Sequence, residues 1–209
     1  MSRMAIPAPV GSSFCMPYET QLVVKPSGSL FDGGKYSIKD GQGNLVFSMK
    51  TEGGFCIEIK RRIYDATTGE VVLLMRKDTP CCGTREWIAF HGDTESESQL
   101  SFTLRAKSSF SSGYVVFLPD NSDATRPDFS VKNNSARRSS FIILFNGKPI
   151  AEAKRAGWPS TGYTVTVYPE VDRALIAALV LITLVEERNR SANAAATAGA
   201  TAGGGGGGF

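Results

Sequence analysis

The sequence is poor in the residues that catalytic and metal sites need. It contains one histidine, His91, and four cysteines, none in a Cys-x-x-Cys pair. Ser-His-Asp or Cys-His catalysis would therefore depend on His91 alone. A zinc site of Cys56, Cys81, Cys82 and His91 is the alternative, but adjacent cysteines are badly spaced to ligate one ion together. We predict a non-enzyme without a catalytic, metal or cofactor site, in which His91 ends a strand and faces solvent.

Strong charge and targeting signals are also missing. The net charge of +3 is small and the basic residues are scattered, so nucleic acid is not an expected partner. The start, MSRMAIPAPVGSS, lacks the apolar stretch of a signal peptide, and Ser2 stands where myristoylation requires glycine. We expect a cytoplasmic monomer with free cysteines, no transmembrane segment and at most peripheral contact with the plasma membrane.

The longest apolar run, ALIAALVLITLV at residues 174–185, predicts an enclosed helix. At about 1.5 Å per residue it spans roughly 18 Å, too little for a hydrocarbon core of about 30 Å. Residues 179–182 alone cover about 300° of a helical wheel. A helix that is apolar on all sides must be enclosed on all sides. We predict that it begins at Pro169, with Arg188 and Arg190 at its end.

The chain before this helix is typical of an antiparallel all-β fold. From Thr20 to Tyr168, short runs of alternating apolar and polar residues are separated by turn residues. Asn146-Gly147 is the strongest of the hairpin signals. Twelve strands are predicted, at residues 21–25, 35–39, 45–50, 55–64, 71–77, 86–91, 99–106, 114–118, 128–132, 139–145, 148–155 and 163–168. We expect a closed sheet around the helix, forming one domain at residues 18–188, with a flexible segment at 1–17 and a disordered Gly/Ala-rich tail at 189–209.

Several segments, taken in order, resemble the LURP-one-related family of plants, which shares the tubby-like C-terminal fold. They are FCMPYETQLVVK at 14–25, GGKYSIKDGQGNLVFSM at 33–49, DATTGEVVLLMRK at 65–77, EWIAFHGD at 86–93, FNGKPIAEAKR at 145–155 and YTVTVYPEVDRALIAALVLITLVEE at 163–187. The resemblance implies a twelve-stranded antiparallel closed barrel around a C-terminal hydrophobic helix, and a link to plant defence. The wider fold includes tubby proteins, which tether to phosphoinositides, and phospholipid scramblases.

Basic clusters are the main signal for a partner. The run KRR at residues 60–62 is followed on the next predicted strand by Arg76 and Lys77. Period-two geometry places Lys60 and Arg62 on one face and Arg61 on the other. Basic residues near an anionic leaflet contribute about 1 kcal/mol each. We predict anionic-lipid contacts at Lys60, Arg62, Arg76 and Lys77; the alternative is an ordinary solvated barrel exterior. Arg137-Arg138 and Lys154-Arg155 repeat the pattern more weakly.

Together these features favour a non-enzymatic regulatory or adaptor protein of the LURP-one-related type. Its expected partner is an anionic membrane lipid such as a phosphoinositide, or another protein. The alternative function is an intracellular barrel that binds a lipid or small molecule in its lumen. A lumen that is filled by the chain's own helix argues against such a carrier.

Overall fold

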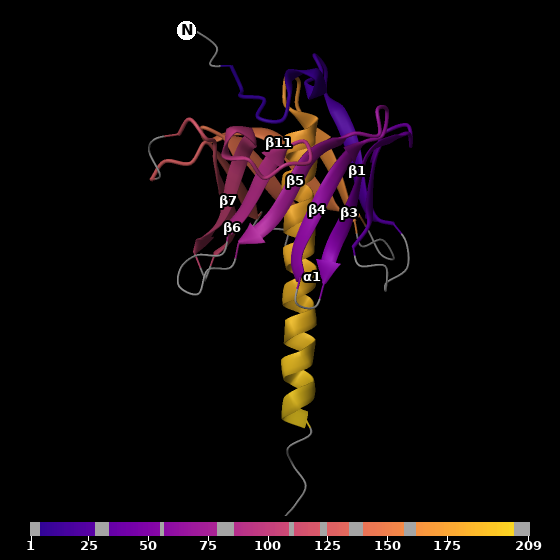
Figure 1. The fold of residues 1–209 in the computed structure, drawn as a ribbon, viewed down its shortest axis with the longest axis vertical. Helices are drawn as coiled ribbons and strands as arrows, with labels where there is room; N and C mark the ends of the chain where they lie inside the picture. Colours follow the sequence, from indigo (N-terminus) through magenta and orange to yellow (C-terminus); the bar gives the residue numbers. More distant parts are fainter. Residues whose placement is uncertain are drawn as a thin grey trace, which may run out of the picture.

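Twelve antiparallel strands form one closed barrel around a single long helix (Figure 1). This computed structural model describes residues 5–27, 34–54, 57–78, 86–108, 111–121, 125–133, 140–156 and 162–202. Each strand pairs with its neighbours in sequence, and β1 closes the barrel on β12. The strands are β1 (Thr20–Pro26), β2 (Tyr36–Asp40), β3 (Leu45–Gly54), β4 (Ile57–Asp65), β5 (Val71–Asp78), β6 (Glu86–His91), β7 (Leu100–Ser108), β8 (Ser111–Phe117), β9 (Phe129–Asn133), β10 (Ser140–Phe145), β11 (Lys148–Arg155) and β12 (Tyr163–Val167). The predicted fold class is therefore confirmed.

The barrel lumen is filled by the first half of helix α1 (Arg173–Ala202). Every residue from Ala174 to Val185 is at most 6% exposed. Inward side chains of the strands pack around it, among them Leu22, Ile38, Phe47, Met75, Phe102 and Val165. Outward residues alternate with them, as in β12, where Tyr163, Val165 and Val167 are buried and the threonines between them are half-buried. The prediction of an enclosed apolar helix is correct.

After Val185 the helix leaves the barrel and continues into solvent as far as Ala202 (Figure 1). We call this the exit end of the barrel, and residues 186–202 the stalk. The prediction of a disordered tail from residue 189 differs from the structure for residues 189–202, which are helical. Alanine has the highest intrinsic helix propensity. The enclosed turns already form the costly nucleus, so the alanine-rich sequence extends the helix at little further cost.

The helix starts at Arg173, not at Pro169 as predicted. Its N-cap is Asp172, whose Oδ1 accepts hydrogen bonds from the backbone N–H groups of Ala174 and Leu175 at 2.9 and 3.1 Å. This is the usual way in which an aspartate satisfies the first donors of a helix. Asp172 is fully buried, and burial raises the pKa of its carboxyl group, although all four of the backbone hydrogen bonds that it accepts oppose the shift.

Residues 5–17 lie across the end of the barrel where the helix begins, which we call the closed end (Figure 1). The N–H groups of Val10 and Gly11 donate to Oδ2 of Asp172 at 2.8 and 3.2 Å. Cys15 forms an isolated β-bridge with Asp172, and the ring of Phe14 packs edge-on against Phe47. The segment that we predicted to be flexible is therefore placed by long-range contacts, and the ordered unit begins before residue 18.

Candidate functional site

The exit end holds a cluster of charged and aromatic side chains around the helix. Nζ of Lys77 and Nε1 of Trp87 both lie within hydrogen-bond distance of Oε1 of Glu186, at 2.5 and 3.1 Å. Lys77 points inward, since its neighbour in register, Trp87, is 3% exposed. This predicted lipid contact therefore lies on the inner face of β5, paired with a carboxylate of the stalk.

Two further contacts hold the stalk where it emerges. The hydroxyl of Tyr163 donates to the carboxylate of Glu187, at 2.9 Å from each oxygen. Nη2 of Arg190 donates to the hydroxyl of Tyr114 at 2.7 Å. Burial raises the pKa of both tyrosines, and for Tyr163 the nearby Glu187 carboxylate adds to the shift. These contacts fix the rotation of the stalk relative to the barrel.

Among the described residues, Arg61 is the most buried basic side chain at this end. It lies on the inner face of β4 and is 9% exposed. Its guanidinium lies 4.8 Å from the centre of the Trp87 ring, a distance typical of a cation–π contact. Burial lowers the pKa of Arg61, while the Tyr36 and Glu186 side chains oppose this shift. Period-two alternation predicted correctly that Arg61 faces away from Lys60 and Arg62, but no role was predicted for it.

A pocket of about 280 Å³ lies between the inner faces of β2, β3 and β4 and the root of the stalk. Its polar lining comes from Tyr36, Thr51, Arg61, Arg188 and Asn189, and Val185 and Ala192 supply apolar surface. Nη1 of Arg188 donates to the Tyr36 hydroxyl at 3.3 Å. Two guanidinium groups from separate elements therefore line one small pocket.

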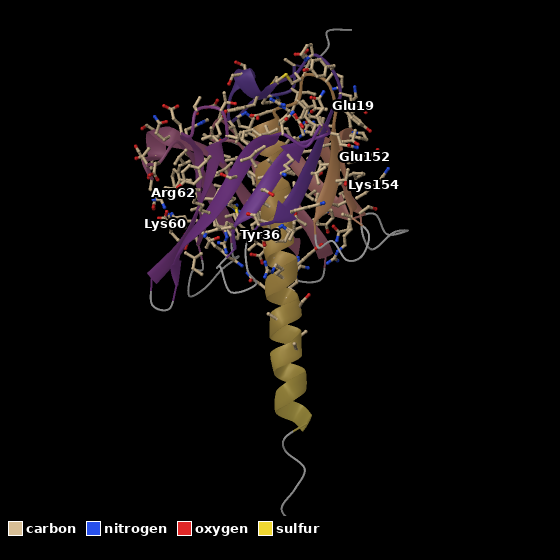
Figure 2. All side chains as sticks on the ribbon, turned by 90° about the vertical axis from the view of Figure 1, so that its right-hand side faces the viewer. Glu19, Tyr36, Lys60, Arg62, Glu152 and Lys154 are labelled. Atoms are coloured by element: carbon tan, nitrogen blue, oxygen red, sulfur yellow. The ribbon has the colours of Figure 1, made fainter. Side chains whose placement is uncertain are left out.

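The other three predicted lipid contacts, Lys60, Arg62 and Arg76, share the outer face of β4 and β5; we call them the β4–β5 patch (Figure 2). Each of them contacts a carboxylate. Lys60 pairs with Glu95, and Nε of Arg76 lies 3.4 Å from the same carboxylate. Arg62 pairs with Glu52 and, at 2.6 Å, with Asp93. The structure brings these three cations together, as predicted, but places three carboxylates among them.

A second group of basic residues lies on the outer face of β11, β1 and β2. Pairing through β12 places Lys154 and Lys39 at the same level, and Lys25 two residues nearer the exit end. All three are exposed, and within the described part of the chain none makes an ion pair. We call Lys25, Lys39 and Lys154 the lysine wall. Only Lys154 belongs to a predicted basic cluster, because Lys25 and Lys39 join it only when β1 closes on β12.

Glu152 and Glu19 lie on the same side of the molecule as the lysine wall, nearer the closed end (Figure 2). The carboxylate of Glu152 accepts a hydrogen bond from the Tyr168 hydroxyl at 3.0 Å. All three lysines of the wall therefore lie on the exit-end side of these two carboxylates.

The residues considered for catalysis and zinc binding are only partly described. His91 ends β6, as predicted. It is half-buried, whereas we predicted that it would face solvent. Cys56, Cys81 and Cys82 lie outside the described residues. Among the residues that the structure does describe, no three His, Cys, Asp or Glu side chains gather as metal ligands would. Within the same residues, no helix is long and apolar enough to span a membrane.

Comparison with known proteins connects this fold to a family. A family model described as LURP-one-related matches residues 20–183, which include all twelve strands and most of the enclosed part of α1. The chain belongs to the LURP-one-related family. Protein LURP-one-related 15 of Arabidopsis thaliana is 32% identical over 185 residues, covering 83% of this chain and 82% of that protein. Protein LURP1 of the same plant is 27% identical over 188 residues, covering 86% of this chain and 89% of its own length.

An X-ray structure of an Arabidopsis thaliana protein has the same fold. It matches with a TM-score of 0.66 and 30% sequence identity, over 86% of this chain and 97% of that one. The LURP-one-related match ends at residue 183, so Arg61 and the lysine wall lie inside it and the stalk lies outside. Arg188, which lines the pocket beside Arg61, belongs to the part of this chain beyond the family model.

Proposed function

We propose that this protein is a non-catalytic regulatory or adaptor protein of plant defence, which works through the outer surface of its barrel. The observation that carries the proposal is the filled lumen, in which Leu175, Leu179 and Ile182 of the central helix are at most 1% exposed. A carrier needs a cavity inside the barrel for its ligand. Here the helix occupies that space, which favours a surface-acting module over the alternative of a lumenal lipid carrier.

The partner that we propose is an anionic membrane, with phosphoinositides as the lipid to test first, bound by the lysine wall. The three lysines of the wall are exposed, whereas the β4–β5 patch is neutralised by its three carboxylates. At about 1 kcal/mol for each basic residue near an anionic leaflet, the wall contributes about 3 kcal/mol. Because about 1.4 kcal/mol is a tenfold change, this corresponds to roughly 150-fold in membrane partition.

The position of the stalk also favours the lysine wall, on the side of the barrel, as the membrane contact and disfavours the exit end. Beyond Ala192, which still lines the pocket with barrel residues, the helix extends roughly 15 Å further to Ala202, at about 1.5 Å per residue. A flat bilayer that approached the exit end would meet the stalk before it met the strands. The three lysines lie on the outward face of β11, β1 and β2, along the side of the barrel, so a bilayer on that side would not meet the stalk first.

Liposome flotation tests the tether. The wild-type protein should float with phosphoinositide vesicles at low salt, less at physiological salt, and not with neutral vesicles, because exposed charges are screened over about 8 Å at physiological ionic strength. Replacing Lys25, Lys39 and Lys154 together by serine should abolish flotation and leave the melting temperature unchanged, since all three are exposed.

The matched control replaces Lys60, Arg62 and Arg76 by serine, which removes the same number of positive charges from the other wall. We expect this variant to float nearly as well as the wild type. If only the control variant loses binding, the β4–β5 patch is the lipid site and the lysine wall is not. If the wild type floats on no anionic vesicle, the tether is wrong and an adaptor for another protein remains.

A further inference from the structure

Arg61 presents a buried positive charge that the described chain does not fully satisfy. Its side chain enters the barrel from β4, opposite Thr51 of β3 and Met75 of β5. It is 9% exposed, and its Nε has no hydrogen-bond partner among the described residues. The ring of Trp87 covers one side of the guanidinium, but a ring face accepts no conventional hydrogen bond. Buried polar groups are normally paired, so an unpaired Nε on a side chain that lines a pocket leaves Arg61 short of one acceptor.

The nearest carboxylate on the stalk is already engaged. Oε1 of Glu186 accepts from both Lys77 and Trp87, at 2.5 and 3.1 Å. Lys77 and Glu186 therefore balance each other. Among the described residues that line the pocket, Arg61 and Arg188 are the charged ones and none is a carboxylate.

The size and the other walls of the pocket restrict what can fill it. Its volume of about 280 Å³ is just below the range of about 300–1,000 Å³ that is usual for ligand sites, so it suits a small anion and not an acyl chain. The Tyr36 hydroxyl, which already accepts from Arg188, and the Asn189 amide supply further donors from the barrel and the stalk. Val185 and Ala192 could pack against a small carbon body attached to the anion.

We propose that this pocket is a binding site for a phosphate-type oxyanion, held between Arg61 of β4 and Arg188 of the stalk. A guanidinium presents a planar fork of N–H donors that matches phosphate oxygens two at a time. A phosphate dianion offers enough oxygens for both forks and balances both charges, whereas a carboxylate offers two oxygens and one charge. The site is on the inner face of the barrel, separate from the lysine wall, and does not depend on the proposed membrane tether.

Binding would tie the stalk to the barrel. Arg61 belongs to the barrel and Arg188 to the stalk, so an oxyanion between them adds a link between the two elements. The contacts already there, Glu187 to Tyr163 and Arg190 to Tyr114, hold the other sides of the helix. The expected signature is therefore a rise in melting temperature with phosphate, together with slower amide exchange around residue 188.

The test uses the full chain and inorganic phosphate at constant ionic strength, with chloride and acetate as comparison anions. The wild type should show saturable binding by calorimetry and a phosphate-dependent rise in melting temperature. Arg61→Gln and Arg188→Gln should each weaken binding at least tenfold. Arg62→Gln is the matched control, because Arg62 is the next residue on the same strand but faces outward and pairs with Glu52 and Asp93. It should bind phosphate as the wild type does.

Arg188 is exposed, so Arg188→Gln gives a folded variant even if the change at Arg61 disturbs the core. Equal binding by the wild type and Arg188→Gln would overturn the proposal, as would acetate binding as tightly as phosphate, or no phosphate binding at all. Glycerol 3-phosphate and vesicles containing phosphatidic acid then separate two sources of the same group. If glycerol 3-phosphate binds saturably and the binding needs Arg188, the ligand is a free phosphate ester. If only vesicles containing phosphatidic acid bind, and their flotation with the protein needs Arg188, the ligand is a lipid headgroup.

Discussion

Asp172 links the two ends of the chain, and replacing it with alanine should be strongly destabilising. One carboxylate accepts four backbone hydrogen bonds, from Ala174 and Leu175 at the start of the helix and from Val10 and Gly11 in the N-terminal segment. These are two different tasks, since one pair caps the helix and the other holds residues 5–17 against the closed end. Alanine can do neither.

The size of the effect follows from these bonds. Loss of the N-cap costs about 0.5–2 kcal/mol. Each N–H that is left without a partner costs about 1–3 kcal/mol when it is buried, and those of Val10 and Gly11 are partly buried, so the lower end applies. Burial raises the pKa of Asp172, so removing the charged group recovers part of its desolvation cost. We expect a net loss of about 2–4 kcal/mol, a large share of the 5–15 kcal/mol that is typical of a domain.

Thermal and urea unfolding measure this loss directly. For a domain of this size about 1 kcal/mol corresponds to about 2–4 °C, so the melting temperature should fall by about 4–16 °C. Hydrogen exchange at the amides of Val10 and Gly11 should become faster than in the wild type. The matched control is Asp40→Ala, because the Asp40 carboxylate also accepts backbone bonds, from Gln42 and Asn44, but in an exposed turn. If both variants melted at the same temperature, the argument that burial magnifies these bonds would be refuted.

Three other changes test the rest of the fold. Leu179→Asp puts an unpaired charge at a fully buried position of the helix, which costs several kcal/mol, and a wild-type melting temperature would contradict the enclosed helix. Ending the chain after Arg190 should shift the melting temperature by no more than about 2 °C, because the described side chains beyond it are exposed; a larger fall would show that stalk residues beyond Arg190 stabilise the barrel. Burial raises the pKa of Tyr163, so its contribution to the free energy of unfolding is fully present below about pH 10, the pKa of tyrosine in the unfolded chain. This contribution is lost as the pH rises through the pKa of Tyr163 in the folded protein. Tyr163→Phe should therefore flatten the alkaline side of a stability–pH curve measured by urea unfolding; an unchanged slope above about pH 10 would count against this.

The fold was predictable because its main signals are local. An apolar run without a polar face must be enclosed wherever it lies, and β-strand alternation marks the inner face one residue at a time. Thus Val165 and Val167 could be assigned to the lumen from their spacing alone, and each of the twelve predicted strands overlaps one in the structure. Asn146, in the left-handed region at φ 47°, makes the turn that Asn-Gly predicts.

The two ends of the chain were harder to predict because composition alone does not decide them. Residues 5–17 are Pro- and Ser-rich, yet they are placed by Asp172, which is more than 160 positions away in sequence. The alanine-rich tail has the composition of a disordered segment, yet it continues a helix that the barrel has already nucleated. In both cases the interaction that orders the segment is made with residues outside the segment, so the composition of the segment does not reveal it.

The charges of the candidate site were also hard to predict, because they depend on partners that are distant in sequence. A run such as Lys60–Arg62 indicates a positive surface only if no carboxylate joins it, and the partners of Arg62 lie 10 and 31 positions away, at Glu52 and Asp93. Exposed ion pairs of this kind add little stability but do cancel the local field. Arg61 is the reverse case, since it points inward and lines the same pocket as Arg188, which comes from the other end of the chain. The charge that matters for binding is therefore the charge left after folding has paired the rest, and in this protein that places the strongest candidates at Arg61, Arg188 and the lysine wall.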